Sequence, residues 1–206
     1  MNTRPMLQTC HPLILASASP RRIQMLSRFG IVFDAVSASV AETPAPGELP
    51  EEYVRRLAAA KAHDVGLRRS GAWIIGADTA ITLDGRAIIG KPADPVNALQ
   101  ILQQLSGRTH QVLTGICLCR PDNTIAAAQV ASTRVTFIHA ANELLQAYIA
   151  TGEPLDKAGA YGIQGLGSFL VREINGSCAN VIGLPISSLL SLLLDHEIIV
   201  PRNRPL

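Results

Sequence analysis

The sequence predicts a mixed α/β fold, and three features of the chain indicate this class. Apolar runs of strand length alternate with amphipathic helical stretches over the first part of the chain. Further on, strand-like runs are joined by turn signals such as Asp84-Gly85, which is typical of hairpins. The 206 residues, 48% of them hydrophobic and 17% charged, suffice to bury a core. We therefore expect a bent mixed sheet or two lobes, and not a purely parallel sheet.

The first expected unit is a strand, a tight turn and a helix. Residues 13–18 form an apolar run of strand length. Ser19 then suits an N-cap, and Pro20 suits the first helical position. The helix is expected to stop near Gly30, because glycine is the preferred residue just beyond a helix end.

A proline-rich loop, a long helix and a buried strand come next. Residues 41–50 carry the loop signals, and the helix after them has Glu51 in its first turn, where the helix dipole favours a carboxylate. Lys61 falls within the apolar stripe of this helix. Residues 73–77 are expected to form a buried strand that ends at Asp78.

The rest of the chain predicts a succession of helices, strands and turns. In order, we expect a helix opened by Asp94 and closed by Gly107, strands over 112–118 and 130–138, a helix over 142–150, a glycine-rich segment over 156–167, a strand over 169–174, a hairpin turn at Asn175-Gly176 and a last helix opened by Pro185. We expect one domain over 1–206, with an ordered core over about 12–196 and a flexible tail over 201–206.

Charge and hydropathy narrow the class of partner. The net charge of +2 gives no argument for a nucleic-acid polymer, so an anionic ligand would have to be held by local cations. The start of the chain shows no signal-peptide pattern, and the most apolar stretch, 184–194, is too short to span a bilayer. We therefore expect a cytoplasmic protein that does not enter the membrane.

The four cysteines do not form the spacing of a disulfide framework or of a zinc site. Cys117 and Cys119 should point to the same face of a strand, since they are two residues apart in an apolar run. Together with Cys10 and Cys178 they are expected to be buried free thiols in a reducing compartment.

The start of the first helix is a candidate phosphate site. Free N–H groups at a helix start favour anions, and Arg21 and Arg22 add forked donors that suit phosphate oxygens. Ser17 lies in the turn before this helix. The alternative is an ordinary helix start whose arginines face water.

Asp78 is the candidate for the reaction chemistry. A carboxylate at a strand end can accept a proton from water or hold a divalent metal, although it could also only cap a turn. Glu42 is a possible second metal ligand, and Lys61 is a phosphate ligand if its stripe borders a cleft. If it does not, the Lys61 side chain simply extends along apolar surface.

Three further residues are weaker candidates when each is taken alone. Lys91 follows Gly90 in a stiff loop, and by itself it predicts no more than a surface lysine. Gln164 carries an amide that can both donate to and accept from the edge of a base. Thr79 could serve the site or a turn cap beside Asp78.

Read together, these pieces resemble the Maf family, also called septum-formation inhibitor proteins. The matching segments occur in the family's order and cover roughly residues 13–194: 17–22 (SASPRR), Arg56-Leu57 with Lys61, 76–79 (GADT), 90–92 (GKP), 106–110 (SGRTH), 156–161 (DKAGAY) and 183–185 (GLP). So many ordered motifs are a far more specific signal than any one of them.

The resemblance implies a fold like that of the inosine-triphosphate pyrophosphatases, with a cleft between two lobes and commonly a homodimer. It implies that Asp78 accepts the proton. The alternative role of Asp78 is to help hold the divalent metal cofactor, Mg²⁺ or Mn²⁺, for which Glu42 is the further candidate ligand. The phosphate and metal positions of the family match Ser17, Arg22, Glu42, Lys61 and Lys91. The positions linked to substrate choice match Arg21, Thr79 and Gln164.

The implied activity is that of the branch that hydrolyses dTTP and UTP to the monophosphate and pyrophosphate. One alternative is a 7-methyl-GTP pyrophosphatase, and another is a non-catalytic nucleotide-binding regulator of septum formation. Ala41 stands where an acidic residue often precedes the glutamate, so we expect a metal site with one carboxylate fewer. The segment from Asp84 to Gly90 is about one residue longer than the corresponding segment of the Maf family usually is.

Overall fold

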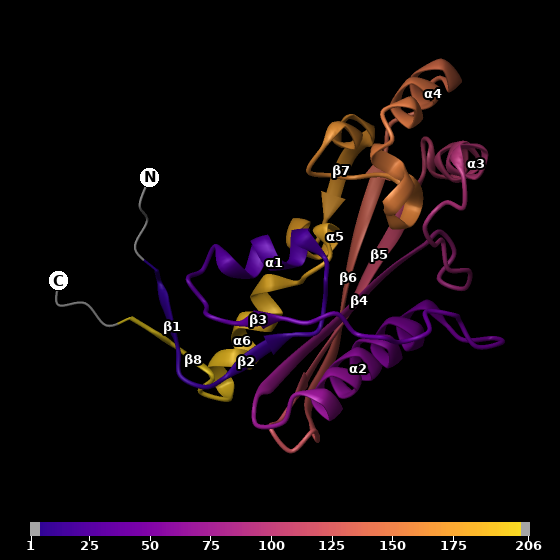
Figure 1. Cartoon of the computed structure of the whole chain (residues 1–206). Helices are drawn as coiled ribbons and strands as arrows, with labels where there is room; N and C mark the ends of the chain where they lie inside the picture. The colour runs from indigo at the N-terminus through magenta and orange to yellow at the C-terminus, as the bar shows by residue number, and fades with distance from the viewer. Residues whose placement is uncertain (1–4, 203–206) are drawn as a thin grey trace.

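A mixed sheet forms the centre of the molecule. The computed structural model describes residues 5–202. Within them, six strands lie in the order β3-β2-β4-β5-β6-β7, and β2 runs parallel to β3 and β4 while the later pairs are antiparallel. Their bounds are β2 (Leu13–Leu15), β3 (Asp34–Ala35), β4 (Trp73–Thr82), β5 (Thr109–Cys119), β6 (Ile125–Phe137) and β7 (Val171–Asn175). The predicted mixed α/β class is therefore confirmed (Figure 1).

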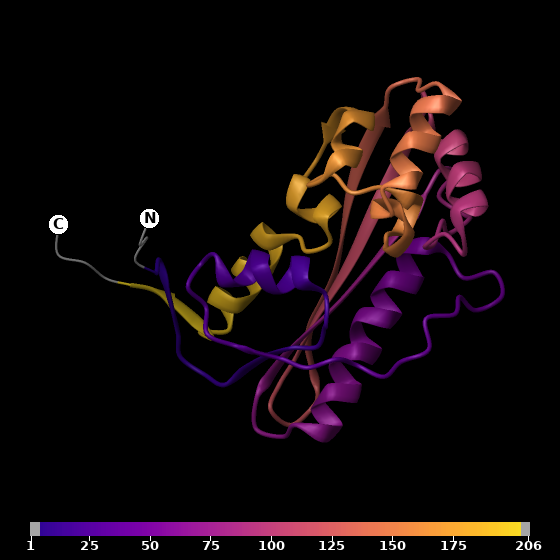
Figure 2. The same cartoon turned by 45° about the horizontal axis from the view of Figure 1, so that its top comes forward.

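Helices cover both faces of this sheet. The α-helices are α1 (Pro20–Ser27), α2 (Pro50–Arg68), α3 (Pro95–Leu105), α4 (Asn142–Ala150), α5 (Cys178–Ile182) and α6 (Ile186–Asp195). Three 3₁₀ segments, η1 (Glu153–Asp156), η2 (Ala158–Ala160) and η3 (Leu166–Leu170), lie in and around the glycine-rich segment. In Figure 2 the long strands lie between α2 on one side and α1 and α6 on the other.

The face opposite α2 carries two separate cores. Near one end, α1 and α6 pack with Ile75 and Ile116 of the sheet. Near the other end, α3 and α4 pack with Val112 and Phe137. Because residues of equal parity along a strand share a face, these two groups form two lobes on the same side of the sheet. The space between the lobes is where a cleft can open.

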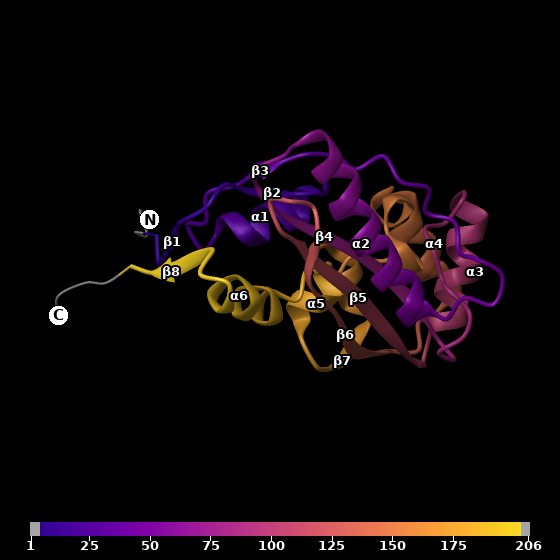
Figure 3. The ribbon, with the colours of Figure 1, turned by 90° about the horizontal axis from the view of Figure 1, so that it is seen from below.

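Two glycines let α2 lie unusually close to the sheet. A Cβ added at Gly76 would come 2.0 Å from the carbonyl oxygen of Ala58, and one at Gly115 would come 2.2 Å from that of Val54. A residue with any side chain would thus push the helix away from β4 and β5, across which it lies in Figure 3. This close packing brings the next turn of α2, with Lys61, against β4.

Several sequence-based expectations differ from the structure. β4 does not end at Asp78 but continues to Thr82, because β5 pairs with it along the whole of that length. Asn175-Gly176 is not a hairpin turn: Ser177 caps the short helix α5 there, its side chain accepting from Asn180 N over 3.2 Å. The strand expected from residue 169 starts at Val171, after η3.

The chain ends were also predicted incompletely. β1 (Leu7–Thr9) and β8 (Ile199–Pro201) form a two-stranded antiparallel sheet, although the ordered core was expected to span about 12–196. Pro201, assigned to the tail, is the last residue of β8, and 203–206 of that predicted tail lie outside the described residues. No helix within 5–202 is both long enough and apolar enough to cross a membrane.

The cysteines are free, as expected, but only two are buried. Cys117 and Cys119 share a face of β5, with their sulfur atoms 3.9 Å apart. Cys10 and Cys178 are exposed, so the expectation that all four thiols are buried was wrong. Cys178 is the first residue of α5, in which Asn180 is the buried residue.

Candidate active site

A cavity of about 660 Å³ is lined by residues of both lobes and, on the α2 side of the sheet, by Glu42, Lys61 and Asp78. It opens where β2 stops and β4 continues: Ala16 N still donates to Ile75 O, and the chain then turns away into α1. One edge of β4 is thereby left without a partner strand beside the cleft, from Ala77 up to the isolated bridge between Ile81 and Ile89. The walls include all nine candidate residues of the sequence: Ser17, Arg21, Arg22, Glu42, Lys61, Asp78, Thr79, Lys91 and Gln164.

Asp78, Lys61 and Glu42 form a compact cluster at one end of this cavity. The Lys61 ammonium lies 2.6 Å from Asp78 Oδ1 and 2.5 Å from Glu42 Oε1. The Asp78 and Lys61 side chains are 8% and 11% exposed, whereas that of Glu42 is 49% exposed. The apolar stripe that contains Lys61 therefore does border a cleft, and the amine is paired with carboxylates.

Burial and charge act in opposite directions on the two carboxyl groups. Burial raises the pKa of Asp78 above its ordinary value, and this effect exceeds the opposing influence of Lys61 and Arg22. For Glu42, burial also acts to raise the pKa, but the hydrogen bond and charge of Lys61 outweigh it and the pKa is lowered. The pKa values of the two carboxyl groups are thus shifted in opposite directions, that of Asp78 upward and that of Glu42 downward.

The segment that carries this cluster is held from outside the cavity. Arg56, one turn before Lys61 on α2, donates to Glu48 through Nε over 2.5 Å and to Thr43 O over 3.2 Å. Tyr53 OH donates to Glu42 O over 3.0 Å. These bonds fix the proline-rich loop over α2, so that Glu42 reaches the lysine.

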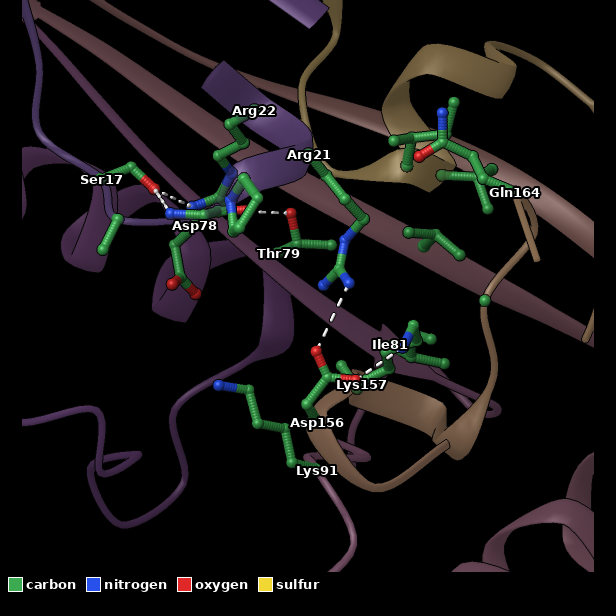
Figure 4. A pocket seen from close by; sticks show the side chains of 18 of the residues that line it. Ser17, Arg21, Arg22, Asp78, Thr79, Ile81, Lys91, Asp156, Lys157 and Gln164 are labelled. Carbon is green, nitrogen blue, oxygen red and sulfur yellow. Dashed lines mark hydrogen bonds and ion pairs between the residues drawn. The ribbon is translucent and has the colours of Figure 1, made fainter. Parts of the chain in front are cut away.

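Arg22 is occupied mainly by the protein itself. Its Nε donates to Gly183 O and its Nη1 to Ala77 O, both over 2.8 Å, and Nη2 donates to Thr79 Oγ1 over 3.0 Å. The hydroxyl of Ser17 lies 3.5 Å from Nη1 (Figure 4). Little donor capacity remains for a phosphate, so the arginine ties α1 to the free edge of β4 and to the end of α5.

Arg21 points into the cavity and reaches the other lobe. Its Nη1 lies 3.5 Å from Asp156 Oδ2, and Figure 4 shows this pair crossing the opening. Asp156 also accepts from Lys157 Nζ over 2.6 Å. Both members of the Arg21–Asp156 pair have exposed heads, at 38% and 68%, so the pair contributes little energy and can open for a ligand.

The remaining candidates line different walls. Thr79 follows Asp78 on β4, with its hydroxyl 2.9 Å from that of Thr114. Lys91 is exposed in the loop after the Asp84 turn and reaches the same cavity. Gln164 is exposed on the far wall, opposite Asp78 (Figure 4). The Asp78, Lys61 and Glu42 cluster and the Gln164 amide therefore lie at opposite ends of the cavity.

The carboxylates at the first end fit a hard divalent cation. Glu42 and Asp78 both contact the same ammonium, which shows that one small cation can lie between them. Mg²⁺ commonly uses one or two protein carboxylates together with substrate phosphates. Within residues 5–202 no group of three histidine, cysteine or acidic side chains could hold a metal, so substrate oxygens would complete this coordination.

The structure also places residues in the cavity wall that sequence reasoning did not select. These are Asp156, Lys157, Tyr161 and Glu153. Tyr161 OH lies 2.9 Å from Nε2 of the fully buried His110, and burial lowers the pKa of this histidine to about 4, which keeps it neutral. The available signal was their position in or beside the glycine-rich segment, but nothing in the sequence shows which of them face inward.

Comparison with known proteins shows to which family this sequence belongs. The model of the family described as Maf-like protein matches residues 12–196. A protein of Nitratidesulfovibrio vulgaris named dTTP/UTP pyrophosphatase is 50% identical over 185 residues, which are 89% of this chain and 87% of the relative. A protein of Myxococcus xanthus with the same name is 48% identical over 182 residues, 88% of this chain and 90% of the relative.

Among solved structures, one of the similar chains is the Ham1 protein of Staphylococcus aureus. It is 15% identical, with a TM-score of 0.49, and the match covers 90% of this chain and 99% of that one. The assignment rests instead on the family match, which spans most of the sequence, and on relatives near half identity along almost their whole length. The chain belongs to the Maf family.

Proposed function

We propose that this protein is a nucleoside-triphosphate pyrophosphatase that hydrolyses dTTP and UTP to the monophosphate and pyrophosphate. The support is twofold. Relatives at 42–50% identity carry the name dTTP/UTP pyrophosphatase. The cavity volume of about 660 Å³ also lies in the range of small-molecule sites, and its two ends differ in chemistry as the two ends of a nucleotide do.

The observation that carries the proposal is the buried Asp78 beside Lys61. A general base works best when its pKa approaches the working pH, and burial moves the pKa of Asp78 in that direction. In the proposed reaction a water oxygen attacks the α-phosphorus, the bond to the bridging oxygen of pyrophosphate breaks, and Asp78 takes the proton of the water. Lys61 holds the carboxylate in place over 2.6 Å.

Cations around this end offset the charge of the leaving pyrophosphate. Lys61 and Lys91 lie on two walls of the cavity, and Arg21 becomes available when its exposed contact with Asp156 opens. Glu42 and Asp78 would hold Mg²⁺ or Mn²⁺ with the substrate phosphates, and the metal would supply further charge neutralisation. Arg22 acts mainly by fixing this corner of the cavity.

The base is proposed to lie at the opposite end. The amide of Gln164 can donate to a carbonyl and accept from an N–H, which is the pattern that thymine and uracil present side by side. Arg21 and Thr79, the other two positions linked to substrate choice, also line this cavity. We further propose a cytoplasmic homodimer that acts on free nucleotides and on no nucleic-acid polymer.

Pyrophosphate release from a panel of nucleoside triphosphates tests this function. With Mg²⁺ or Mn²⁺ present, dTTP and UTP should be the best substrates, and removal of the metal with EDTA should abolish turnover. Preference for 7-methyl-GTP would point to the other enzymatic branch. If no nucleotide of the panel releases pyrophosphate while nucleotide binding is retained, the result would favour a non-catalytic regulator and refute the proposed activity.

A further inference from the structure

Glu153 directs its carboxylate into the segment that carries Gln164. It is the first residue of η1, directly after Gly152, whose φ of 77° turns the chain out of α4. The residue is partly buried in the cavity wall. Nothing in the proposed reaction uses it, because it lies at the amide end of the cavity and not beside Asp78.

Three donors converge on this carboxylate. Its Oε1 accepts from Tyr148 OH over 2.9 Å and from Gly167 N over 3.0 Å. Its Oε2 accepts from Leu166 N over 2.8 Å. The same tyrosine hydroxyl accepts from Gly162 N over 3.1 Å, so the pair of side chains fixes backbone N–H groups on both sides of Gln164.

The glycines of the segment make room for the carboxylate. A Cβ added at Gly165 would lie 2.4 Å from Glu153 Oε2, and one at Gly162 would lie 3.1 Å from Oε1. The segment itself supplies weak support, since Gly165 N donates to Gly162 O over 3.3 Å, a long hydrogen bond. The path of the chain from 162 to 167 therefore depends on an acceptor that comes from outside the segment.

We propose that Glu153 is the positioning residue of the base-recognition segment: its carboxylate holds residues 162–167 in the conformation that presents Gln164 to the pyrimidine. This inference rests on the proposed function, in which Gln164 contacts the base. Glu153 does not touch the substrate. Hydrogen bonds from two backbone N–H groups and a phenol to one carboxylate are charge-assisted and among the stronger ones in proteins.

The test is Glu153→Gln, with Glu173→Gln as the matched control. Glutamine keeps the shape of the side chain but turns one oxygen into a donor, which must face a backbone N–H of Leu166 or Gly167. Glu173 is exposed on β7, so its substitution should change nothing. For Glu153→Gln we expect the KM for dTTP to rise about tenfold while kcat changes less than about threefold.

Amide hydrogen exchange gives a readout that does not depend on turnover. The amides of Leu166 and Gly167 should exchange faster in Glu153→Gln, whereas those of β4 and β5 should not change. Tyr148→Phe, which removes a donor to Glu153 and the acceptor for Gly162 N, is expected to show the same pattern more weakly. If Glu153→Gln fails to fold, the Tyr148→Phe variant tests the proposal in its place.

The outcomes separate this inference from the proposed function. Unchanged KM and unchanged exchange in folded Glu153→Gln would overturn the positioning role, and so would a loss of kcat at constant KM, which indicates fewer folded molecules. A wild-type protein that turns over no nucleotide would instead refute the proposed function. In that case the exchange rates at Leu166 and Gly167 still report whether Glu153 holds the segment.

Discussion

The two ends of the cavity are built in different ways. At the phosphate end, Asp78 and Lys61 come from a long strand and a long helix, packed together through Gly76 and Gly115. At the base end, Gln164 comes from a segment between short 3₁₀ turns, held by the Glu153 carboxylate. Regular elements support Asp78 and Lys61 at the first end, whereas the conformation at the second end depends on a few side-chain hydrogen bonds.

This difference predicts how substitutions divide between chemistry and recognition. Changes at the phosphate end should lower kcat, since they affect groups that act only as the reaction proceeds. Changes at the base end should raise KM and alter the choice of base with little effect on kcat. A substitution at the phosphate end that raised only KM, or one at the base end that lowered only kcat, would contradict this division.

The largest effect is expected for Asp78→Asn. Loss of the proton acceptor should lower kcat by about a thousandfold while KM for dTTP changes little. Pyrophosphate release measures the rate, and circular dichroism checks the fold. Asp195→Asn, at the exposed end of α6, is the control and should retain full activity. Substantial turnover by folded Asp78→Asn would contradict the assignment of the base.

Lys61→Met should come next, with a fall in kcat/KM of about a hundredfold at neutral pH. The lysine acts to lower the pKa of both Asp78 and Glu42, so its removal raises both values. Because Asp78 must be ionised to act, the acid limb of the pH profile should move to higher pH. In the wild type that limb should already lie above 3.8, the ordinary value for aspartate.

The control for the lysine is Arg69→Met, which removes an exposed cation at the end of the same helix. Its pH profile should overlay that of the wild type. An acid limb that stays in place in Lys61→Met would show that the limb reports a group other than Asp78.

Arg22→Lys should mainly affect stability. A lysine cannot replace the forked bonds to Gly183 O, Ala77 O and Thr79, so the free energy of unfolding should fall by about 2–3 kcal/mol. Arg21→Lys, at the neighbouring position with an exposed head, should cost less than about 1 kcal/mol. Urea unfolding compares the two variants. Equal decreases in the free energy of unfolding would show that Arg22 has no special structural role.

The smallest effect is expected at the base end, for Gln164→Glu. A carboxylate cannot donate to a base carbonyl, so the KM for dTTP should rise about tenfold with kcat nearly unchanged. Gln104→Glu, on the exposed side of α3, is the matched control. A fall in kcat without a change in KM would place Gln164 in the chemistry and not in recognition.

The same contrast explains what could be foreseen from the sequence. The strand–helix unit that contains Arg22, the long helix with Lys61 and the helix over 142–150 follow from apolar periodicity and capping residues, which are local signals. Asp78 is recognisable as a site residue from the sequence, but the continuation of β4 beyond it is not. The length of β4 depends on its pairing with β5, which is a long-range property.

The base end could not be derived from local patterns. Gln164 is selected from the sequence only as an amide of suitable chemistry and through the resemblance to the Maf family, while the one signal for Glu153 is its position beside the glycine-rich segment. Its role depends on a carboxylate that reaches backbone N–H groups 13 and 14 residues further along the chain. The hydrogen bonds from Arg22 to the carbonyl oxygens of Ala77 and Gly183 could not be predicted either, because they join residues 55 and 161 positions apart in the sequence.

The most direct test of this two-ended site is a crystal structure of Asp78→Asn with dTTP and Mg²⁺. We expect the α-phosphorus to lie beside residue 78, the phosphates within reach of Lys61 and Lys91, and the thymine edge against Gln164. A nucleotide bound in the reverse direction, with thymine beside Lys61 and the phosphates beside Gln164, would contradict this expectation.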